Sequence, residues 1–281
     1  MSRLYRLKNW RLENLHLENL RLMNLLLVTV AALVFCLSSV AQDCPAVKDW
    51  KYDTMSCWPT KYPQCCSQSN EATKDIQQSP INIRSSTEDQ SLTLEVHYNG
   101  VEVPVVNNGH SIEVEYEHQA AAPRNYVKYK GTEYTLQQFH FHQPSEHQIN
   151  GPPGAAMEVH LVHKDGNGKY LVVGVLVNRG TANEGFGKIL ANIGGHSTVN
   201  AIQMIPGTQP TNHLKFYTYT GSLTTPPCTP GVTWVVLKDP ISFSAEQIKT
   251  YGDLDGGKFA QTFRYPQIPI TRLTVTRNFK P

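Results

Sequence analysis

The sequence predicts one β-dominated domain of the α+β class, with a few small helices at its periphery. Residues 91–96 (SLTLEV) and 111–116 (SIEVEY) alternate polar and apolar side chains, which is the period of half-buried strands. Residues 158–162 (EVHLV) and 170–177 (YLVVGVLV) flank a turn segment, KDGNG, and this pattern predicts a hairpin. No linker divides residues 80–281, so these elements belong to one domain.

Two further segments carry helix signals, and one more carries a strand signal. Residues 183–192 begin at Asn183 and residues 244–251 begin at Ser244, and both residue types cap the N-termini of helices. Residues 233–237 (TWVVL) are rich in β-branched and aromatic side chains and are predicted to form a strand.

The charge of the chain excludes some classes of partner. The 281 residues carry a formal net charge of +2. Nucleic-acid-binding proteins concentrate basic residues in a patch or stripe, and this sequence has no such feature. We therefore expect no nucleic-acid partner and no electrostatic attachment to a membrane or a polyanion.

The N-terminus has the features of an export signal. Residues 25–37 (LLLVTVAALVFCL) form an uncharged apolar run that is short for a membrane span. Residues 39–41 (SVA) fit a signal-peptidase site. Residues 1–41 are therefore predicted to be a signal peptide, and residues 42–281 the mature domain, secreted to the extracellular space without membrane attachment. An uncleaved signal anchor is the alternative.

A short repeat precedes the apolar run. Residues 11–25 read RLENL, HLENL and RLMNL, and a period of five matches neither a helix nor a strand. We interpret residues 1–22 as an extended n-region of the signal, or as sequence upstream of an alternative start at Met23.

The cysteines fit an exported protein, because disulfides form and persist outside the cell. Cys36 leaves with the signal, so five of the six cysteines remain, and an odd number leaves one thiol free or bonded between chains. We therefore expect a monomer or a disulfide-linked dimer. Four of the five lie near the N-terminus of the mature chain, where a zinc knuckle is the alternative interpretation. The five are Cys44, Cys57, Cys65, Cys66 and Cys228.

Three histidines are placed to converge on a metal ion. His140 and His142 are two residues apart, so a strand presents both on one face while the phenylalanines beside them point into a core. His160 lies in the first strand of the predicted hairpin. If the two strands pair, three imidazoles converge and one position of a tetrahedral ion stays open. That arrangement is typical of catalytic zinc, whereas structural sites use four protein ligands.

Polar neighbours strengthen the metal hypothesis. Gln137 and Glu158 are candidates to orient imidazole N–H groups, and Glu146 lies close by in the sequence. The other histidines, among them His147 and His163, are interpreted as ordinary core or surface side chains.

Several motifs, in one order along the chain, resemble a known family. They are Gln78-Ser-Pro-Ile-Asn-Ile83, Asn107-Asn-Gly-His110, Gln138-Phe-His-Phe-His142, Ser145-Glu-His147, Glu158-Val-His-Leu-Val-His163 and Tyr219-Thr-Gly-Ser-Leu-Thr-Thr-Pro-Pro227. From about Trp50 to Arg272, the chain closely resembles the α-class carbonic anhydrases of the secreted type. The resemblance implies a central, mostly antiparallel twisted sheet of about ten strands, with zinc at the floor of a conical cleft.

The resemblance implies an enzyme that reversibly hydrates carbon dioxide to bicarbonate and a proton, with His140, His142 and His160 holding Zn²⁺. Zinc ionises water near neutral pH, an effect for which carbonic anhydrases are themselves the reference case, and the zinc-bound hydroxide would attack carbon dioxide. Sulfonamides and anions are the expected inhibitors. Apolar side chains beside the metal would hold the substrate, with ordinary strand core as the alternative role. They are Val162, Val172, Leu223, Val232 and Trp234.

The same resemblance implies roles for polar residues. Thr224 would donate its proton to Glu146 and orient the attacking hydroxide, and Thr225 would contact bicarbonate. His110 would carry the proton to solvent, because imidazole titrates near neutral pH. Two further residues would order the intervening water, Tyr52 and Asn108.

The chain also departs from the family pattern. Gln143-Pro144 stands where many members have Trp-Gly and a longer loop, which implies a shorter cleft rim. Thr262 stands where many members use Asn to support the third zinc histidine, and this puts that contact in doubt. Lys51 and Glu113 differ from the common cleft residues and are expected to change the order of solvent and the speed of proton transfer.

One disulfide is implied by the resemblance alone. Extracellular members often join a cysteine before the Gln-Ser-Pro motif to one after the Thr-Thr-Pro-Pro turn. Cys228 matches the second position, and Cys65 or Cys66 matches the first. The partner of the remaining cysteine stays open, and Cys44 with Cys57 is the further pair that we favour.

Two other functions stay open at this point. One is a noncatalytic, carbonic-anhydrase-like extracellular binding or matrix protein, although such relatives usually lack one or more of the zinc histidines. The other is a zinc esterase that uses the same hydroxide.

Overall fold

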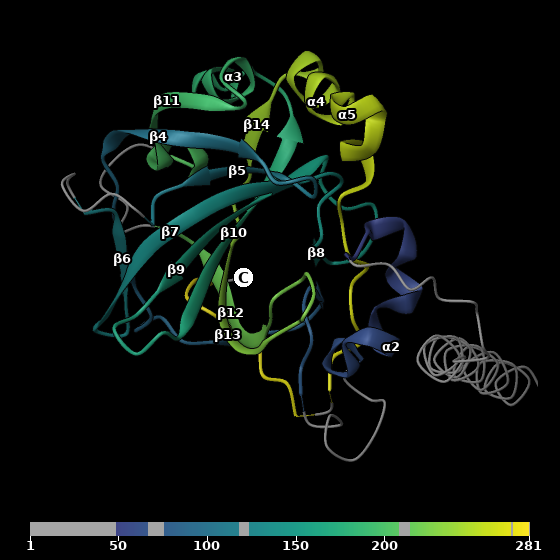
Figure 1. The fold of residues 1–281 in the computed structure, drawn as a ribbon. Coiled ribbons are helices and arrows are strands. Elements are labelled where there is room, and N and C mark those ends of the chain that lie inside the picture. The colour runs from purple at the N-terminus through teal and green to yellow at the C-terminus, as the bar shows by residue number, and fades with distance from the viewer. Residues whose placement is uncertain (1–48, 67–75, 118–123, 208–213, 271, 281) are drawn as a thin grey trace, which may run out of the picture.

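Alternating side chains build one large twisted sheet at the centre of the computed structural model, which describes residues 49–66, 76–117, 124–207, 214–270 and 272–280 (Figure 1). Ten of its thirteen strands follow one path of neighbours. In order across the sheet they are β11 (Gly195–Asn200), β4 (Gly100–Asn107), β5 (Ile112–Glu115), β7 (Thr132–His142), β9 (Met157–Lys164), β10 (Tyr170–Arg179), β13 (Pro230–Leu237), β12 (Phe216–Ser222), β15 (Thr276–Arg277) and β2 (Thr87–Glu88). The remaining strands of this sheet are β3 (Leu94–His97), β6 (Tyr126–Tyr129) and β14 (Ile241–Phe243).

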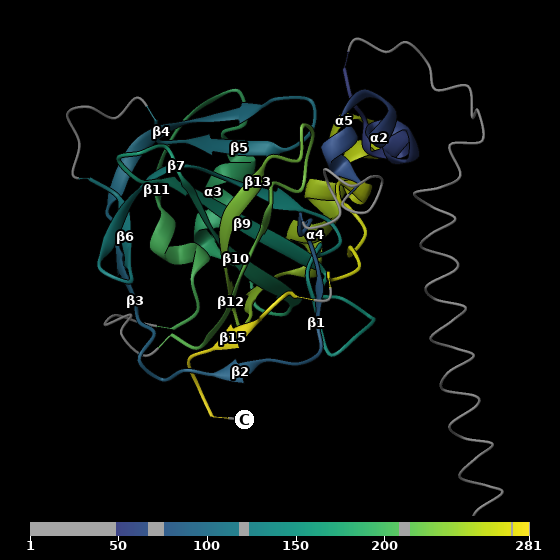
Figure 2. The same ribbon diagram turned by 90° about the horizontal axis from the view of Figure 1, so that it is seen from below.

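Most neighbouring strands along this path are antiparallel, as expected. The parallel pairs are β10 with β13 and β15 with β2, and β14 also joins β10 in parallel. A separate parallel pair is formed by β1 (Asn82–Ile83) and β8 (Gln148–Ile149). Figure 2 shows β4 and β5 on one side of the molecule and β15 and β2 on the opposite side. The predicted fold class and the sheet of about ten strands are confirmed.

The predicted elements form close to their expected bounds. The hairpin of residues 158–162 and 170–177 is β9 and β10, which pair in antiparallel register. The strand expected at 233–237 lies within β13. The strand expected at 111–116 forms over its central residues as β5, and the one expected at 91–96 begins only at Leu94, in β3.

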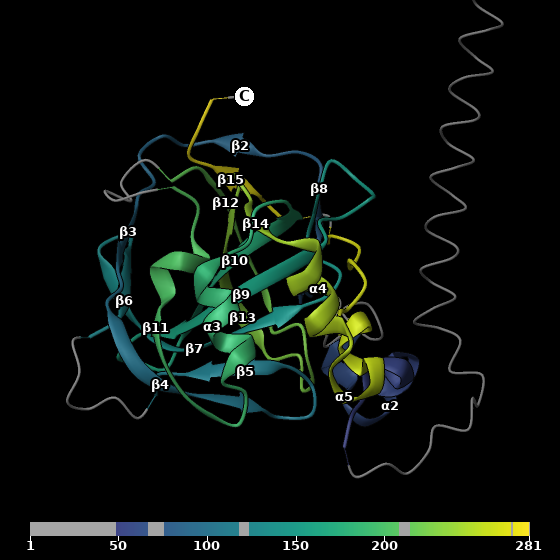
Figure 3. The ribbon, with the colours of Figure 1, turned by 90° about the horizontal axis from the view of Figure 1, so that it is seen from above.

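Both predicted helices are present and capped as their sequences indicate. The side chain of Asn183 accepts from the Phe186 N–H at the start of α3 (Glu184–Ala191). Ser244 and Gln247 form a capping box at the start of α4 (Ala245–Gly252). The helices share a buried apolar cluster with strands β7 and β9, and Figure 3 shows them on one face of the sheet.

Short helical segments complete the described part of the chain, and they lie mainly beside the sheet rather than on it (Figure 1). They are η1 (Tyr52–Cys57), α2 (Trp58–Lys61), η2 (Pro63–Cys65), η3 (Ala201–Met204), α5 (Leu254–Gly257) and η5 (Lys258–Gln261).

Cys65 and Cys228 form a disulfide, which settles the choice between Cys65 and Cys66. The bond joins residues 163 positions apart in the sequence and packs beside Trp58. Cys57 and Cys66 are disulfide-bonded as well, so the free thiol expected from the odd count is not among the described cysteines. Cys44 lies outside the described residues, as do the predicted signal peptide and the Met23 start. Among the described residues, no helix is long and apolar enough to cross a membrane.

A buried histidine makes the fold sensitive to acid. The ring of His163 is fully buried, lies 2.6 Å from the Tyr98 hydroxyl, and is 3.2 Å from the Leu171 carbonyl oxygen. Burial lowers the pKa of His163 to about 3. Between about pH 6.5 and pH 3, His163 therefore binds a proton in the unfolded chain but not in the folded chain.

We predict that this histidine lowers the free energy of unfolding as the pH falls through that window, by about 1.4 kcal/mol for each pH unit. Urea unfolding of the wild type and of His163→Gln, followed from pH 7 to pH 4, measures the effect. The variant is less stable at pH 7, and its deficit should shrink toward low pH. The other histidines are common to both proteins and cancel in the difference. A deficit that is constant with pH contradicts the prediction.

Candidate metal centre and its surroundings

Two neighbouring strands bring the three predicted ligands together. His140 and His142 lie on β7, His160 lies on β9, and the pairing of these strands sets His140 directly opposite His160. One nitrogen from each ring lies within 4.8 Å of the others. His142 and His160 are buried, and His140 is half-buried. The strands thus form the three-histidine cluster that the sequence predicts.

Each ring is held through the nitrogen that does not face the cluster. Nδ1 of His140 donates to the Gln138 side-chain oxygen at 2.8 Å. Nδ1 of His142 donates to the backbone oxygen of Thr262 at 2.7 Å, and Nε2 of His160 donates to Glu158 at 3.0 Å.

These contacts leave one ring nitrogen of each histidine for a metal. They are Nε2 of His140, Nε2 of His142 and Nδ1 of His160. Nε2 of His142 is buried and has no hydrogen-bond partner, which is costly for a polar atom unless an ion binds there. The residues present therefore fit a divalent metal ion with three imidazole ligands.

Burial keeps the three rings neutral, the state in which imidazole binds metal. It lowers the pKa of His140 well below its ordinary value and lowers the pKa of His142 to about 4. The pKa of His160 is lowered by the same cause, against the opposing effect of Glu158. A neutral imidazole keeps its lone pair, so the cluster is ready to coordinate at neutral pH.

The partner of His140 is Gln138, and the expectation for Gln137 was wrong. A register irregularity between Leu136 and Gln138 lies in the pairing of β7 with β9. Beyond it, Gln138 shares a face with His140 at a spacing of two residues. The Gln137 amide instead donates to the backbone oxygen of Thr135 at 3.1 Å.

The doubt over Thr262 is resolved by a backbone contact. Its carbonyl oxygen, rather than its side chain, accepts the hydrogen bond from the ring, and it supports the second histidine rather than the third. Any residue type offers a carbonyl at this position, so replacement of Asn by Thr leaves the contact intact. The Thr262 hydroxyl accepts from the backbone N–H of Gln143 at 3.2 Å.

Glu158 is fully buried and binds more than one partner. Besides His160, its carboxylate accepts from the His147 ring at 2.8 Å and from the backbone N–H groups of Glu146 and His147 at 2.8 and 2.7 Å. Burial acts to raise the pKa of Glu158, but the two histidines and their hydrogen bonds hold it well below its ordinary value. The carboxylate is therefore ionised, and it orients the third ligand.

His147 was interpreted from the sequence as ordinary, and the structure places it inside this network. Its Nδ1 faces Glu158, and its Nε2 lies 2.7 Å from the Tyr219 hydroxyl. Although His147, Glu158 and His160 are also close enough to hold a metal, both His147 nitrogens are already occupied. The Ser-Glu-His motif was the available signal for this role.

Glu146 lies beside the rings of His142 and His160, on the loop after β7. One carboxylate oxygen accepts from the Arg264 N–H at 2.7 Å, and the other is buried without a hydrogen-bond partner. Burial raises the pKa of Glu146, while His160, the Thr224 hydroxyl and the Arg264 N–H oppose the rise. Glu146 and Thr224 therefore approach each other as expected, with one carboxylate oxygen still available.

An apolar cluster borders the metal centre. The Trp234 ring contacts the His160 ring, with their centroids 4.8 Å apart. Leu223 is half-buried against the cluster, and Thr225 follows on the same loop. The residues expected to form the apolar wall therefore belong to one cluster, and Trp234 brings that cluster into contact with His160. The buried members are Val162, Val172, Val232 and Trp234.

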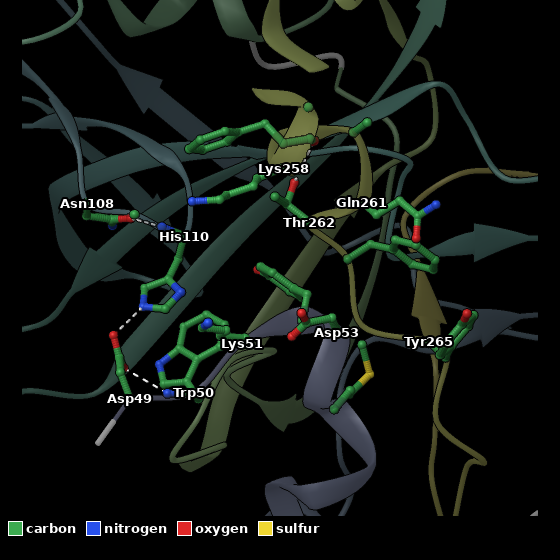
Figure 4. A pocket seen from close by; sticks show the side chains of 17 residues that line it. Asp49, Trp50, Lys51, Asp53, Asn108, His110, Lys258, Gln261, Thr262 and Tyr265 are labelled. Atoms are coloured by element: carbon green, nitrogen blue, oxygen red, sulfur yellow. Dashed lines mark hydrogen bonds and ion pairs between the residues drawn. The ribbon is translucent and has the colours of Figure 1, made fainter. Parts of the chain in front are cut away.

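The polar residues expected at the rim gather around a neighbouring pocket of about 520 Å³ (Figure 4). Tyr52, Asn108 and His110 all line it. The Tyr52 hydroxyl lies 3.4 Å from Nδ1 of His142, which places one side of this pocket next to the metal centre. Asn108 donates to Glu113 at 3.2 Å, and burial raises the pKa of Glu113 to about 7.

The segment that forms this site matches the model of a known protein family. A model of the eukaryotic-type carbonic anhydrases matches residues 53–278. The chain belongs to this family. It is therefore an enzyme of the class that interconverts carbon dioxide and bicarbonate, and carbonic anhydrases of this family depend on zinc.

Bacterial and plant carbonic anhydrases are similar to the chain. A carbonic anhydrase of Pectobacterium carotovorum is 36% identical over 181 residues, which are 63% of this chain and 71% of that protein. Alpha carbonic anhydrase 3 of Arabidopsis thaliana is 34% identical over 214 residues, or 72% and 74% of the two chains. The α-carbonic anhydrase of Thermovibrio ammonificans, solved with the inhibitor sulfanilamide, superposes with a TM-score of 0.68 at 30% identity, covering 81% of this chain and 98% of that one.

The contrast between Gln138 and Gln137 gives a matched pair of variants of the enzyme. We predict that Gln138→Ala weakens zinc binding by about 10- to 100-fold, because His140 loses the partner that orients its ring. Gln137→Ala, one residue away, should leave zinc affinity unchanged. Competition with a chromophoric chelator measures both. Equal losses in the two variants would show that Gln138 has no special role in holding the ring.

Proposed function

We propose that the chain catalyses the reversible hydration of carbon dioxide at a zinc ion held by His140, His142 and His160 at the floor of a cleft. The observation that carries the proposal is the convergence of three neutral imidazoles, one of which presents a buried nitrogen without a hydrogen-bond partner. Bound zinc supplies a Lewis acid that makes water acidic enough to ionise near neutral pH. With three protein ligands, one position stays open for that water.

Thr224 and Glu146 orient the nucleophile. Glu146 is fixed by the Arg264 N–H, and its second oxygen is the natural acceptor for the Thr224 hydroxyl proton. A threonine that donates to a carboxylate keeps its own oxygen lone pairs for a hydrogen bond from the attacking oxygen. The nucleophile is thereby turned so that a lone pair faces the carbon of the substrate.

The apolar cluster receives carbon dioxide. The substrate is small and has no net charge or dipole, so dispersion contacts and exclusion of water hold it better than hydrogen bonds do. Val162, Val172 and Trp234 offer such a surface beside His160. Thr225, next to Thr224 on the same loop, would contact the more polar product.

His110 carries the proton away from the metal centre. Its side chain is 21% exposed, so the ring can reach both protein-bound and bulk water. Tyr52 and Asn108 line the same pocket and supply polar groups for a chain of water molecules. Imidazole is suited to this task because it accepts and releases protons near neutral pH.

We predict that the zinc-loaded protein hydrates carbon dioxide and that a chelator abolishes this activity. Stopped-flow hydration with a pH indicator measures the rate, and added zinc should restore it. His140→Ala should lose both zinc and activity. Sulfanilamide, which occupies the Thermovibrio ammonificans enzyme, should inhibit the zinc-loaded wild type.

Thr224→Ala separates catalysis from metal binding. It should retain zinc and lower kcat/KM by on the order of 10²-fold, because the hydroxyl acts on the reacting oxygen. A zinc-loaded wild type without hydration activity would favour a noncatalytic binding protein instead. Hydrolysis of activated esters without hydration of carbon dioxide would favour an esterase.

We also propose that residues 1–41 direct export and that the mature enzyme begins at Gln42, because the apolar run ends at a signal-peptidase motif. The full-length chain expressed in a secreting host should appear in the medium with Gln42 as its first residue. N-terminal sequencing of the exported protein measures this. A chain that is retained in the membrane fraction with its N-terminus intact would identify an anchor instead.

A further inference from the structure

His110 is held by three contacts on the wall of the pocket (Figure 4). Its Nε2 lies 3.1 Å from a carboxylate oxygen of Asp49. Its ring stacks on Trp50 with centroids 3.8 Å apart and planes 12° from parallel. Its backbone N–H donates to the Asn108 side chain at 2.9 Å. The ring is thus fixed in position and in orientation.

Asp49 is itself anchored toward the ring. One of its carboxylate oxygens accepts from the Trp50 backbone N–H at 2.9 Å, and the other faces His110. An ionised carboxylate only accepts hydrogen bonds. Nε2 of His110 must therefore carry a hydrogen to make this contact, and in the neutral ring Nδ1 is then the nitrogen with the free lone pair.

We propose that Asp49 is a positioning residue for proton export, because its carboxylate selects the Nε2–H tautomer of His110 and leaves Nδ1 to accept and release the proton. The proposal rests on the shuttle role of His110 given above. In each cycle Nδ1 takes one proton from a water molecule and gives it to a buffer molecule, while the Nε2–H bond and the charge of Asp49 stay unchanged. In many enzymes, a hydrogen bond to a carboxylate fixes the tautomer of a histidine that transfers protons or binds a metal.

Other charged groups surround the same pocket, and the contacts described for His110 do not include them. Lys51, Asp53 and Lys258 line the pocket, and Glu113 is joined to the His110 loop through Asn108. Asp53 carries the same charge as Asp49 in the same pocket. It therefore provides a matched control for a change in net charge.

The effect of Asp49 is expected to be modest, because 69% of its side chain is exposed to solvent. Asp49→Asn keeps the shape but can offer His110 either an oxygen or an N–H group, so the preference for one tautomer is lost. We expect kcat in weak buffer to fall by about three- to fivefold, the size of one exposed ion pair. Neither kcat/KM nor kcat in concentrated imidazole should change, since the carbon dioxide step does not involve His110. Asp49→Glu should retain most of the wild-type rate, and Asp53→Asn all of it.

A second readout reports the ring directly. Nitrogen NMR of the zinc-loaded protein should show the neutral His110 mainly as the Nε2–H tautomer in the wild type and in Asp49→Glu, and as a mixture of tautomers in Asp49→Asn. This measurement depends on the ring and not on the turnover rate. An unchanged tautomer, or an unchanged rate in weak buffer, overturns the proposal.

His110→Ala separates this proposal from the proposed function. If it lowers turnover in weak buffer while Asp49→Asn does not, the shuttle stands and the role of Asp49 falls. If Asp49→Asn slows the enzyme equally in the His110→Ala background, Asp49 acts without the ring and the proposal is overturned. If His110→Ala leaves turnover unchanged, the shuttle role fails and the export role of Asp49 fails with it.

Discussion

A single buried carboxylate, that of Glu158, organises the metal centre. Its two oxygens bind the ring of the third ligand, the ring of His147 and two backbone N–H groups of the loop that carries Glu146. An ionised group without solvent is stable only when such partners surround it. The sheet makes room for it at Gly174, which lies opposite His160 on β10, where a Cβ atom would come within 3.0 Å of the carboxylate. Glu158 therefore holds both the His160 ring and the loop that carries Glu146.

A second buried charge connects this centre to the N-terminal segment. The guanidinium of Arg264 is 2% exposed and donates to the Gln78 side chain at 2.9 Å and to the Ser79 carbonyl at 2.7 Å, while its backbone N–H holds Glu146. The Gln78 amide also donates to the carbonyl of Cys228, next to the disulfide. Segments far apart in the sequence thus meet behind Glu146. The Gln-Ser-Pro motif has a structural role here, because it receives the buried cation.

Local patterns in the sequence were sufficient to predict several of the strands, the helix caps and the ligand set. The alternation around His140 and His142 fixes a shared face, and Asn183 and Ser244 begin helices because their side chains satisfy free N–H groups. The number of strands came only from the family resemblance. Pairing between distant strands is set by contacts that a local pattern does not contain.

The errors have equally specific causes. Gln137 was the wrong partner for His140, because simple alternation along β7 already sets Gln138, two residues before His140, on the same face as the ring, while Gln137 points to the other face. Thr262 was judged by its side chain, whereas the contact uses its backbone. The role of His147 is not visible in a local pattern, because its partners Glu158 and Tyr219 are close to it in space but distant in the sequence.

The hydrogen bonds that hold the three imidazoles all come from the protein itself, through a side-chain amide, a backbone carbonyl and a carboxylate. The rings consequently lose their rotational freedom when the chain folds rather than when an ion arrives. The three imidazoles therefore behave like a rigid chelator. Differences in affinity among divalent ions then reflect how well the bond lengths and preferred angles of each ion match the fixed positions of the three ring nitrogens. An ion that matches them poorly binds weakly, because the rings do not move to accommodate it.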